Sequence, residues 1–486
     1  MSAPSPSRPG WSLHHVQQSG RSVARLLRPT SLENALALLT DPAVRPIAGG
    51  TDLLVDLDRG GPGPDVELLD LAGIDELRGI TVTVDQVTLG ALTTHNEVVA
   101  HPELQQVALP LAQACLEIGS PQLRNRATVA GNVATASPAN DTISALLALD
   151  ASVVLRSTAG ERSVALDDFF TGFRSTDLQP GELIMAITFP PMGPNTTGMW
   201  VKLGNRAAQA ISVVHLAATV TRNDHGEVLD AKLAIGSVAA RVVRLPGAEA
   251  LLVGSPLTDE RIAATGQAVA AAVSPIDDVR ATGEYRTETI PTLVRRTLAT
   301  LRDGDASTRW PSDPPCLGRR QRRKPIIGEV DELVEISVIV NGETHRSTRA
   351  QARSLLAWLR DEAGMTGAKE GCAEGECGAC TVALDGQAVM SCLVNAAQAD
   401  GATVVTAEGV ATADGPSRLQ QAFVDEFAVQ CGFCIPGFIV AGSALLAEIP
   451  QPTDEQIRLA LSGNLCRCTG YYPIEQAVRV AAASDS

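Results

Sequence analysis

Residues 371–382 read GCAEGECGACTV, and this stretch decides the fold of the surrounding part of the chain. Three cysteines within it have the spacing C-x4-C-x2-C, and a fourth follows after eleven more residues: Cys372, Cys377, Cys380 and Cys392. This spacing is typical of plant-type ferredoxins, in which four thiolates hold a 2Fe–2S cluster. The alternative is zinc, but structural zinc sites favour paired C-x2-C elements. We therefore predict a 2Fe–2S cluster on these cysteines.

A second set of four cysteines follows in two tight pairs: Cys431, Cys434, Cys466 and Cys468. The C-x-C spacing of the last pair is too tight for most structural zinc sites. The other two of the ten cysteines, Cys115 and Cys316, stand alone. Clustered cysteines in a chain of this length, without the apolar segment of a signal peptide, indicate metal binding more often than disulfides. We predict a second 2Fe–2S cluster on this set.

The residues around the cysteines predict two small domains. Two strand-like stretches each end at a strong hairpin signal, Asn341-Gly342 and Asp385-Gly386. From Arg418 to Ala483 the pattern is helical throughout. We assign residues 334–410 to a plant-type 2Fe–2S ferredoxin domain and residues 411–486 to a helical 2Fe–2S domain.

The N-terminal part of the chain alternates between helix and strand patterns. Capping-box spacing at Thr30 and Glu33, and again at Thr94 and Glu97, predicts two helix starts. Residues 82–89 are rich in valine and threonine and predict one strand. The sequence therefore predicts α+β structure before the cysteine-rich part.

Two α+β units fit this pattern, over residues 25–192 and 195–302, and the last helix is expected to begin at Pro291. Residues 303–333 contain several prolines and the basic run 319–324. Proline density with like charge predicts an extended, solvated linker.

Residues 1–24 contain serines and arginines, and no acidic residue precedes Glu33. This composition is shared by organelle transit peptides and by disordered polar extensions. We adopt the disordered extension as the prediction.

The composition limits the partners and the compartment. A net charge of −16 argues against nucleic acid, because an excess of carboxylates repels phosphate. The longest apolar stretch, about residues 435–447, is shorter than the roughly 20 residues that a membrane span needs. We expect a cytoplasmic protein.

His95, His101 and His215 are isolated in the sequence, so we expect exposed or capping histidines rather than a mononuclear metal site.

Two segments of the first unit have the character of diphosphate-binding loops. One is a short apolar strand that runs into a Gly-Gly turn and a helix: Pro46, Ile47, Ala48, Gly49, Gly50, Thr51, Asp52 and Leu53. The other is a small-residue loop beside two arginines, residues 122–132, followed by Asp141 at the head of a helix. Backbone N–H groups at such turns favour anions. Each segment alone could equally be structural, and no GxGxxG motif indicates a Rossmann site.

Together these motifs resemble the molybdenum hydroxylases of the xanthine dehydrogenase/oxidase family. Residues 334–482 are similar to the iron–sulfur module of that family, and all eight ligand positions are filled. Residues 25–302 are similar to its FAD-binding medium subunit. The resemblance implies a multidomain α+β protein: an FAD-binding domain of the molybdenum hydroxylase type, a C-terminal flavoprotein domain, a β-grasp ferredoxin domain and a four-helix 2Fe–2S domain.

The resemblance also implies roles for individual residues. Residues 46–53 and Thr128 would bind the FAD diphosphate, and Asp141, Ile184 and Lys202 would lie along the cofactor. Gly131 and Asn132 would also belong to the cofactor site. Gln430, just before the second C-x2-C pair, matches the family residue that touches the molybdopterin of the partner.

The function implied is electron transfer. Electrons would come from a molybdopterin-binding large subunit, pass through the Cys431 cluster and then the Cys372 cluster to FAD, and leave to NAD⁺ or oxygen. The large subunit and this chain would form a heterodimer able to dimerise further. The main alternative is a flavin and iron–sulfur NAD(P)H reductase feeding an oxygenase, against which the second cluster counts. A pure redox-sensing or binding module is the other alternative.

Overall fold

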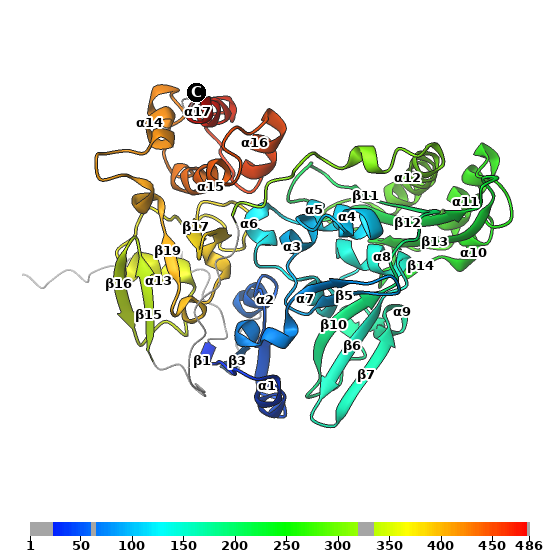
Figure 1. Ribbon diagram of the computed structural model, residues 1–486, viewed down its shortest axis with the longest axis horizontal. Helices are drawn as coiled ribbons and strands as arrows, with labels where there is room; N and C mark the ends of the chain where they lie inside the picture. Colours follow the sequence, from blue (N-terminus) through cyan, green and yellow to red (C-terminus); the bar gives the residue numbers. More distant parts are fainter. Residues whose placement is uncertain (1–22, 60–64, 319–334, 484–486) are drawn as a thin grey trace, which may run out of the picture.

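The structure, a computed structural model, describes residues 23–59, 65–318 and 335–483 (Figure 1). The basic run 319–324 and most of the predicted N-terminal extension lie outside these residues. Val23 and Ala24, which we assigned to the extension, already belong to the first strand. Within the described ranges, no helix combines the length and the apolar character needed to cross a bilayer.

The first unit begins with a small parallel sheet in the order β1-β3-β2. Its elements are β1 (Val23–Leu27), α1 (Leu32–Leu38), β2 (Val44–Ile47), α2 (Leu53–Arg59) and β3 (Val66–Asp70). The expected cap at Thr30 is wrong by one residue, because the Ser31 side chain accepts the hydrogen bond from Asn34 N and begins the helix. Serine in extended backbone is a favourable N-cap, so this register satisfies a free helical N–H.

A second sheet of five strands has the order β4-β5-β10-β6-β7. Its strands are β4 (Ile80–Val82), β5 (Val87–Gly90), β6 (Ser152–Ser157), β7 (Gly160–Ala165) and β10 (Leu183–Phe189). The single strand expected over residues 82–89 is wrong, since the chain turns back at Thr83–Gln86 and Val84 is exposed at the tip.

Short helices lie between the strands of the second sheet along the chain. They are α3 (His95–Val99), α4 (Leu104–Val107), α5 (Leu109–Glu117), α6 (Pro121–Arg124), α7 (Val129–Thr135), α8 (Asp141–Ala148) and α9 (Leu166–Phe169), with a small hairpin of β8 (Phe170–Gly172) and β9 (Ser175–Thr176). The capping box at Thr94 and Glu97 is confirmed at the start of α3.

The second unit is an antiparallel sheet in the order β11-β12-β13-β14, covered by two long helices (Figure 1). Its elements are β11 (Thr196–Leu203), β12 (Val214–Arg222), β13 (Val228–Gly236), β14 (Val243–Arg244), α10 (Pro246–Glu249), α11 (Asp259–Ala271) and α12 (Gly283–Asp303). The helix expected from Pro291 begins at Gly283 instead, capped by Thr282, and contains Pro291 in its interior. Gly266 packs directly on Pro291, so the proline lies in a close contact between the two helices.

One segment of the described linker is buried rather than solvated, whereas most residues from 303 to 313 are exposed as expected. Pro314, Pro315, Cys316 and Leu317 are buried. The carbonyl oxygen of Cys316 accepts hydrogen bonds from Asn96 and Asn125 of the first unit. This segment is therefore packed between domains, which the proline content alone did not indicate.

The ferredoxin domain is a five-stranded sheet in the order β16-β15-β19-β17-β18. Its elements are β15 (Ile336–Val340), β16 (Glu343–Ser347), α13 (Leu355–Asp361), β17 (Thr381–Leu384), β18 (Gln387–Met390) and β19 (Thr403–Val405). Both predicted hairpins are present, and Asn341-Gly342 and Asp385-Gly386 all have positive φ, as two-residue turns of this kind require.

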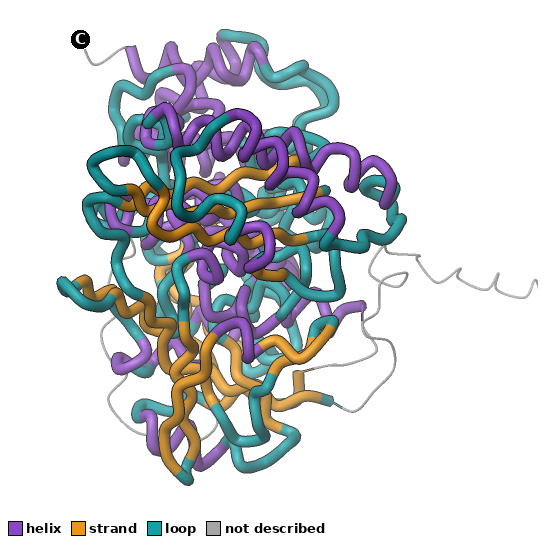
Figure 2. The backbone as a smooth tube through the Cα atoms, turned by 90° about the vertical axis from the view of Figure 1, so that its right-hand side faces the viewer, coloured by secondary structure: helices purple, strands orange, loops and turns teal. Residues whose placement is uncertain are grey.

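Four helices end the described chain: α14 (Arg418–Asp425), α15 (Ile435–Glu448), α16 (Asp454–Leu461) and α17 (Tyr472–Ala483). They gather at the upper end of the molecule, above the ferredoxin sheet (Figure 1), and helices also lie at the end marked C in the perpendicular view (Figure 2). The small parallel sheet of the first unit shares one hydrophobic core with the ferredoxin domain, in which Leu26 and Leu68 pack with Val338 and Trp358. The flavin and iron–sulfur halves are thus joined by a continuous core.

Candidate functional site

The first cysteine set lies in a loop between α13 and β17, with Cys392 directly after β18. The structure brings these cysteines together as two hydrogen-bonded pairs, Cys372 with Cys377 and Cys380 with Cys392. Three backbone N–H groups, of Glu374, Glu376 and Cys377, point at the Cys372 sulfur at 3.3–3.4 Å. The hydrogen bond from Cys377 and these N–H groups outweigh burial and lower the pKa of Cys372 to about 5. The loop thus favours thiolate, the form that binds metal, at Cys372.

The second set is also arranged in pairs. Cys431 pairs with Cys468, and Cys434, at the start of α15, pairs with Cys466. Cys431 and Cys468 are exposed, whereas Cys380 and Cys392 of the first set are buried. The hydroxyl of Tyr471 accepts a hydrogen bond from Cys466 N at 3.1 Å, which fixes the loop between α16 and α17.

Both donor sets fit a two-iron cluster better than a single ion. Among the described residues, no three His, Cys, Asp or Glu side chains are placed to share one metal ion. A 2Fe–2S cluster needs four thiolates, two for each iron. The pairwise approach of the eight cysteines matches this requirement, so they are the residues that would hold the clusters.

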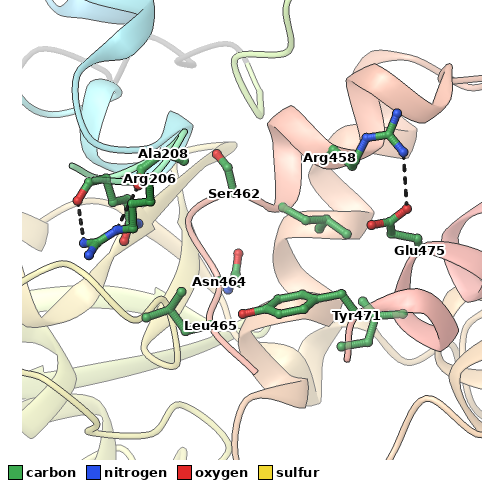
Figure 3. Close-up of a pocket in the computed structure, with 11 residues that line it drawn as sticks. Arg206, Ala208, Arg458, Ser462, Asn464, Leu465, Tyr471 and Glu475 are labelled. Carbon is green, nitrogen blue, oxygen red and sulfur yellow. Dashed lines mark hydrogen bonds and ion pairs between the residues drawn. The ribbon is translucent and has the colours of Figure 1, made fainter. Parts of the chain in front are cut away.

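The two cysteine loops touch each other. Leu465 N, just before Cys466, donates to the carbonyl oxygen of Cys377 at 2.9 Å. Beside this contact lies a pocket of about 270 Å³, between residues 206–209 of the second unit and the helical domain (Figure 3). Its lining includes Arg206, Gln209, Arg458, Leu461, Leu465 and Tyr471.

The two predicted diphosphate segments meet in the structure. A Cβ at Gly49 would collide with the carbonyl oxygen of Arg126, so the Gly-Gly turn lies directly against the second loop. Thr128 caps α7 and accepts a hydrogen bond from Gly131 N at 2.9 Å. Thr135 donates to the Asp52 carboxylate at 3.2 Å, and burial raises the pKa of Asp52. The Gly-Gly turn of segment 46–53 and the start of α7 therefore lie side by side, whereas Gln122, at the start of segment 122–132, is buried and hydrogen-bonded to Asn464.

Asp141 and Lys202 form a buried ion pair, with 2.8 Å between Asp141 Oδ2 and Lys202 Nζ. Ser212 donates to the other carboxylate oxygen at 2.8 Å, and the Lys202 ammonium also donates to the Glu117 carbonyl. Ser212 was not singled out from the sequence, since a lone serine before a strand carries no signal. Ile184 is buried on β10.

The remaining predicted residues are Asn132 and Gln430. The Asn132 side chain accepts a hydrogen bond from Thr142 at 2.5 Å, which ties α7 to α8. Gln430 is exposed, next to the exposed Cys431. It is therefore accessible to a partner.

The histidines differ from the expectation. His95 and His215 are fully buried, with His95 Nδ1 at 3.4 Å from the sulfur of Cys115 and His215 Nδ1 at 2.7 Å from the hydroxyl of Ser144. Burial, with a smaller effect of the Arg124 charge, lowers the pKa of His95 to about 3. These histidines are neutral core residues.

Four family models match consecutive parts of the chain. Residues 21–192 match an FAD binding domain in molybdopterin dehydrogenase, and residues 200–301 match a CO dehydrogenase flavoprotein C-terminal domain. Residues 338–407 match a 2Fe-2S iron-sulfur cluster binding domain, and residues 406–479 match a [2Fe-2S] binding domain. These matches confirm the predicted cofactors, FAD and two 2Fe–2S clusters.

Curated relatives match the two halves separately. The iron–sulfur half is 51% identical to the nicotinate dehydrogenase small FeS subunit of Eubacterium barkeri, over 30% of this chain and 94% of that subunit. The flavin half is 32% identical to the nicotinate dehydrogenase FAD-subunit of the same organism, over 57% of this chain and 95% of that subunit.

A solved structure supports the same relationship. The carbon monoxide dehydrogenase of Hydrogenophaga pseudoflava contains a chain that is 30% identical, with a TM-score of 0.55 over 60% of this chain and 99% of that chain. Together with the family models, this similarity confirms the predicted multidomain α+β fold.

Proposed function

Because this chain belongs to the molybdenum hydroxylase family, as its FAD-binding and 2Fe–2S electron-transfer components in one polypeptide, we propose that it connects a separate molybdopterin-binding subunit to a soluble electron acceptor. The substrate is then oxidised on the partner, and this chain removes the electrons. The partner and this chain form a heterodimer, the unit from which larger assemblies are built.

The surface around the second cysteine set is the observation that carries this proposal. Large apolar side chains are exposed around the exposed Cys431 and Cys468: Val424, Phe427, Val429, Phe433, Leu465, Tyr471 and Tyr472. Phe427 and Tyr472 are 83% and 82% exposed. Apolar groups gathered in this way mark protein interaction sites. We propose that the molybdopterin-binding subunit covers this face and that Gln430 reaches toward its cofactor.

The order of the two clusters is supported by the contacts on either side of the first cysteine set. The hydrogen bond from Leu465 to Cys377 joins it to the second set. On the other side, Gly375 packs near Leu123 of the FAD-binding domain. These contacts support the proposed order, in which electrons pass from the Cys431 set through the Cys372 set to FAD.

The flavin half is the part of the chain from which we propose that electrons leave to the acceptor. Bound FAD would supply the exchange between one-electron carriers and a two-electron acceptor. Residues 46–53 and Thr128 would hold its diphosphate, and Asp141 and Lys202 would lie along it, close to the place where NAD⁺ or oxygen takes the electrons.

Binding to the partner tests the proposed face. The double variant Phe427→Asp/Tyr472→Asp should weaken association with the co-purifying large subunit, because two charges would be buried in an apolar interface. Val84→Asp is the matched control, since Val84 is 89% exposed at a hairpin tip in the flavin half. Equal binding by the double variant and the control would contradict the proposed face.

The direction of electron flow is tested by Cys468→Ser in the assembled complex. Serine is a harder ligand than thiolate, so the second cluster should be lost or altered. After substrate is added, FAD should then stay oxidised on the turnover timescale. Stopped-flow absorption of the flavin band would measure this. The isolated chain should oxidise no substrate. Undiminished flavin reduction in the variant would show that electrons bypass this cluster.

A further inference from the structure

Gln122 of the FAD-binding domain reaches the junction of the two cysteine loops. Its Nε2 donates to Asn464 Oδ1 at 2.8 Å, and Asn464 Nδ2 donates to the carbonyl oxygen of Gly378 at 3.0 Å. Gln122 is completely buried and Asn464 nearly so. Gly378 lies between Cys377 and Cys380, and Asn464 is two residues before Cys466. One side chain from the flavin half is therefore linked to both cysteine loops.

The junction holds two consecutive carbonyl groups of the first loop. Asn464 and Thr381 both donate to the Gly378 carbonyl, and Leu465 N donates to the Cys377 carbonyl. These carbonyls belong to the segment that would wrap the first cluster. Asn464 and Leu465 thus help to hold the carbonyl groups of Cys377 and Gly378 in place. Both residues directly precede Cys466 in the sequence.

Close backbone packing leaves no freedom at this point. A Cβ at Gly463 would collide with Gln122 Oε1, and a Cβ at Gly378 would collide with the carbonyl oxygen of Gly463. Figure 3 shows Asn464 and Leu465 on the loop between α16 and α17, among the residues that line the pocket. Within the described residues, Gln122 Oε1 has no hydrogen-bond partner, so the amide is held by its contact with Asn464 alone.

We propose that Gln122 is a positioning residue for electron transfer, which fixes Asn464 and thereby the dipoles of the Cys377–Gly378 segment at the first cluster. This inference rests on the proposed assignment of the clusters to the two cysteine sets. Hydrogen bonds and dipoles around the ligands tune the potential of an iron–sulfur cluster. The flavin domain would therefore set the properties of the cluster that feeds it.

The test is a redox titration of the full-length, cofactor-loaded chain, in which electron paramagnetic resonance detects the reduced clusters. Gln122→Met keeps the length of the side chain but removes the donor to Asn464. Asn464 then loses the hydrogen bond from Gln122, so its donation to the Gly378 carbonyl should weaken, while Thr381 still donates to that oxygen. The less neutralised carbonyl dipole disfavours an added electron. We expect the midpoint potential of the first cluster to shift downward and its spectrum to change, with FAD content unchanged. The loss of one signal in Cys377→Ser identifies the first cluster.

Gln113→Met is the matched control. Gln113 is also a buried glutamine of the FAD-binding domain, and its amide is hydrogen-bonded to Trp200 N and to the Ala306 carbonyl rather than to a cysteine loop. It should leave both cluster signals unchanged. If Gln122→Met does not fold, Gln122→Asn can be used instead. Its amide lies one methylene farther from Asn464, and the midpoint potential of the first cluster should shift in the same direction.

The outcomes separate this inference from the proposed function. Wild-type protein without two 2Fe–2S signals would contradict the cluster assignment. Two wild-type signals that do not respond to Gln122→Met or Gln122→Asn, or that respond equally to Gln113→Met, would overturn the role of Gln122 alone.

Discussion

Arg28 of the FAD-binding domain forms an ion pair with Asp400 of the ferredoxin domain, with 3.0 Å between Nη1 and Oδ2. Arg28 follows β1 and is almost fully buried. It also lies 3.6 Å from the Asp70 carboxylate and donates to the carbonyl oxygen of Ala397. One guanidinium therefore joins the flavin half to the iron–sulfur half, beside the hydrophobic core that the two share.

Removing this guanidinium should destabilise the junction between the halves. Arg28→Met leaves the Asp70 and Asp400 carboxylates without their shared cation, and breaking a buried pair in this way costs about 3–5 kcal/mol. Denaturant unfolding would measure the loss. Arg25→Met is the control, because Arg25 on the same strand pairs with Glu67 at the surface, where an ion pair contributes about 0–1 kcal/mol. Similar effects of the two substitutions would contradict a special role of Arg28.

Iron content tests the two cysteine sets separately. Two 2Fe–2S clusters correspond to about four irons per chain with equal sulfide. Cys377→Ser and Cys468→Ser should each lower iron by up to about half and leave FAD in place, since the cysteine sets and the flavin loops occupy different domains. Zinc in place of iron after anaerobic purification would contradict the cluster prediction.

Flavin content tests the contact between the two diphosphate segments. Gly49→Ala places a Cβ against the Arg126 carbonyl and should separate the segments, so bound FAD should fall sharply while iron stays constant. Gly247→Ala is the control, because no atom lies within 4 Å of a Cβ at that position. Full FAD retention in Gly49→Ala would place the diphosphate elsewhere. Absorption spectra and iron analysis of the same samples give both quantities.

The parts of the fold that were predicted correctly depend on local signals. The hairpins at Asn341-Gly342 and Asp385-Gly386 follow from the backbone that these pairs adopt, and the capping box at Thr94 follows from a contact over three residues. The cysteine spacing predicted the clusters because a loop around a cluster imposes its own spacing. The positions that would bind FAD stay predictions, although the structure brings the two loops together.

The features that were missed depend on contacts between distant residues. Gln122 and Asn464 are 342 positions apart, so no local pattern joins them. The burial of Pro314–Leu317 arises because Asn96 and Asn125 bind the Cys316 carbonyl, which proline content cannot reveal. The histidines were misjudged for the same reason, since only tertiary packing buries His95 and His215.

The Asp141–Lys202 pair should be needed for flavin binding and for stability. Asp141→Ala leaves the Lys202 ammonium buried without its carboxylate, at a cost of about 3–5 kcal/mol. FAD content should fall while iron is unchanged. Asp230→Ala is the control, because Asp230 is half exposed and pairs with Lys232 at the surface. Normal FAD content and stability in Asp141→Ala would show that the pair has no part in holding the flavin.

His95 should make the stability of the flavin half depend on pH. Burial, and to a lesser extent the Arg124 charge, lowers its pKa from 6.5 to about 3 in the folded protein. Below pH 6.5 the unfolded chain binds a proton that the folded chain does not. The free energy of unfolding should therefore fall as the pH drops below 6.5, by up to about 1.4 kcal/mol per pH unit from this residue, and flatten only near pH 3.

Unfolding by denaturant between pH 5 and pH 7.5 would measure this dependence. His95→Asn keeps a polar atom near the position of Nδ1, beside the Cys115 sulfur, but cannot titrate, so the slope below pH 6.5 should become shallower. Part of the slope should remain, because burial also lowers the pKa of His215. The exposed His225 provides the control, and His225→Asn should keep the wild-type slope. A wild-type slope in His95→Asn would mean that His95 is protonated in the folded protein, which its position in the core does not allow.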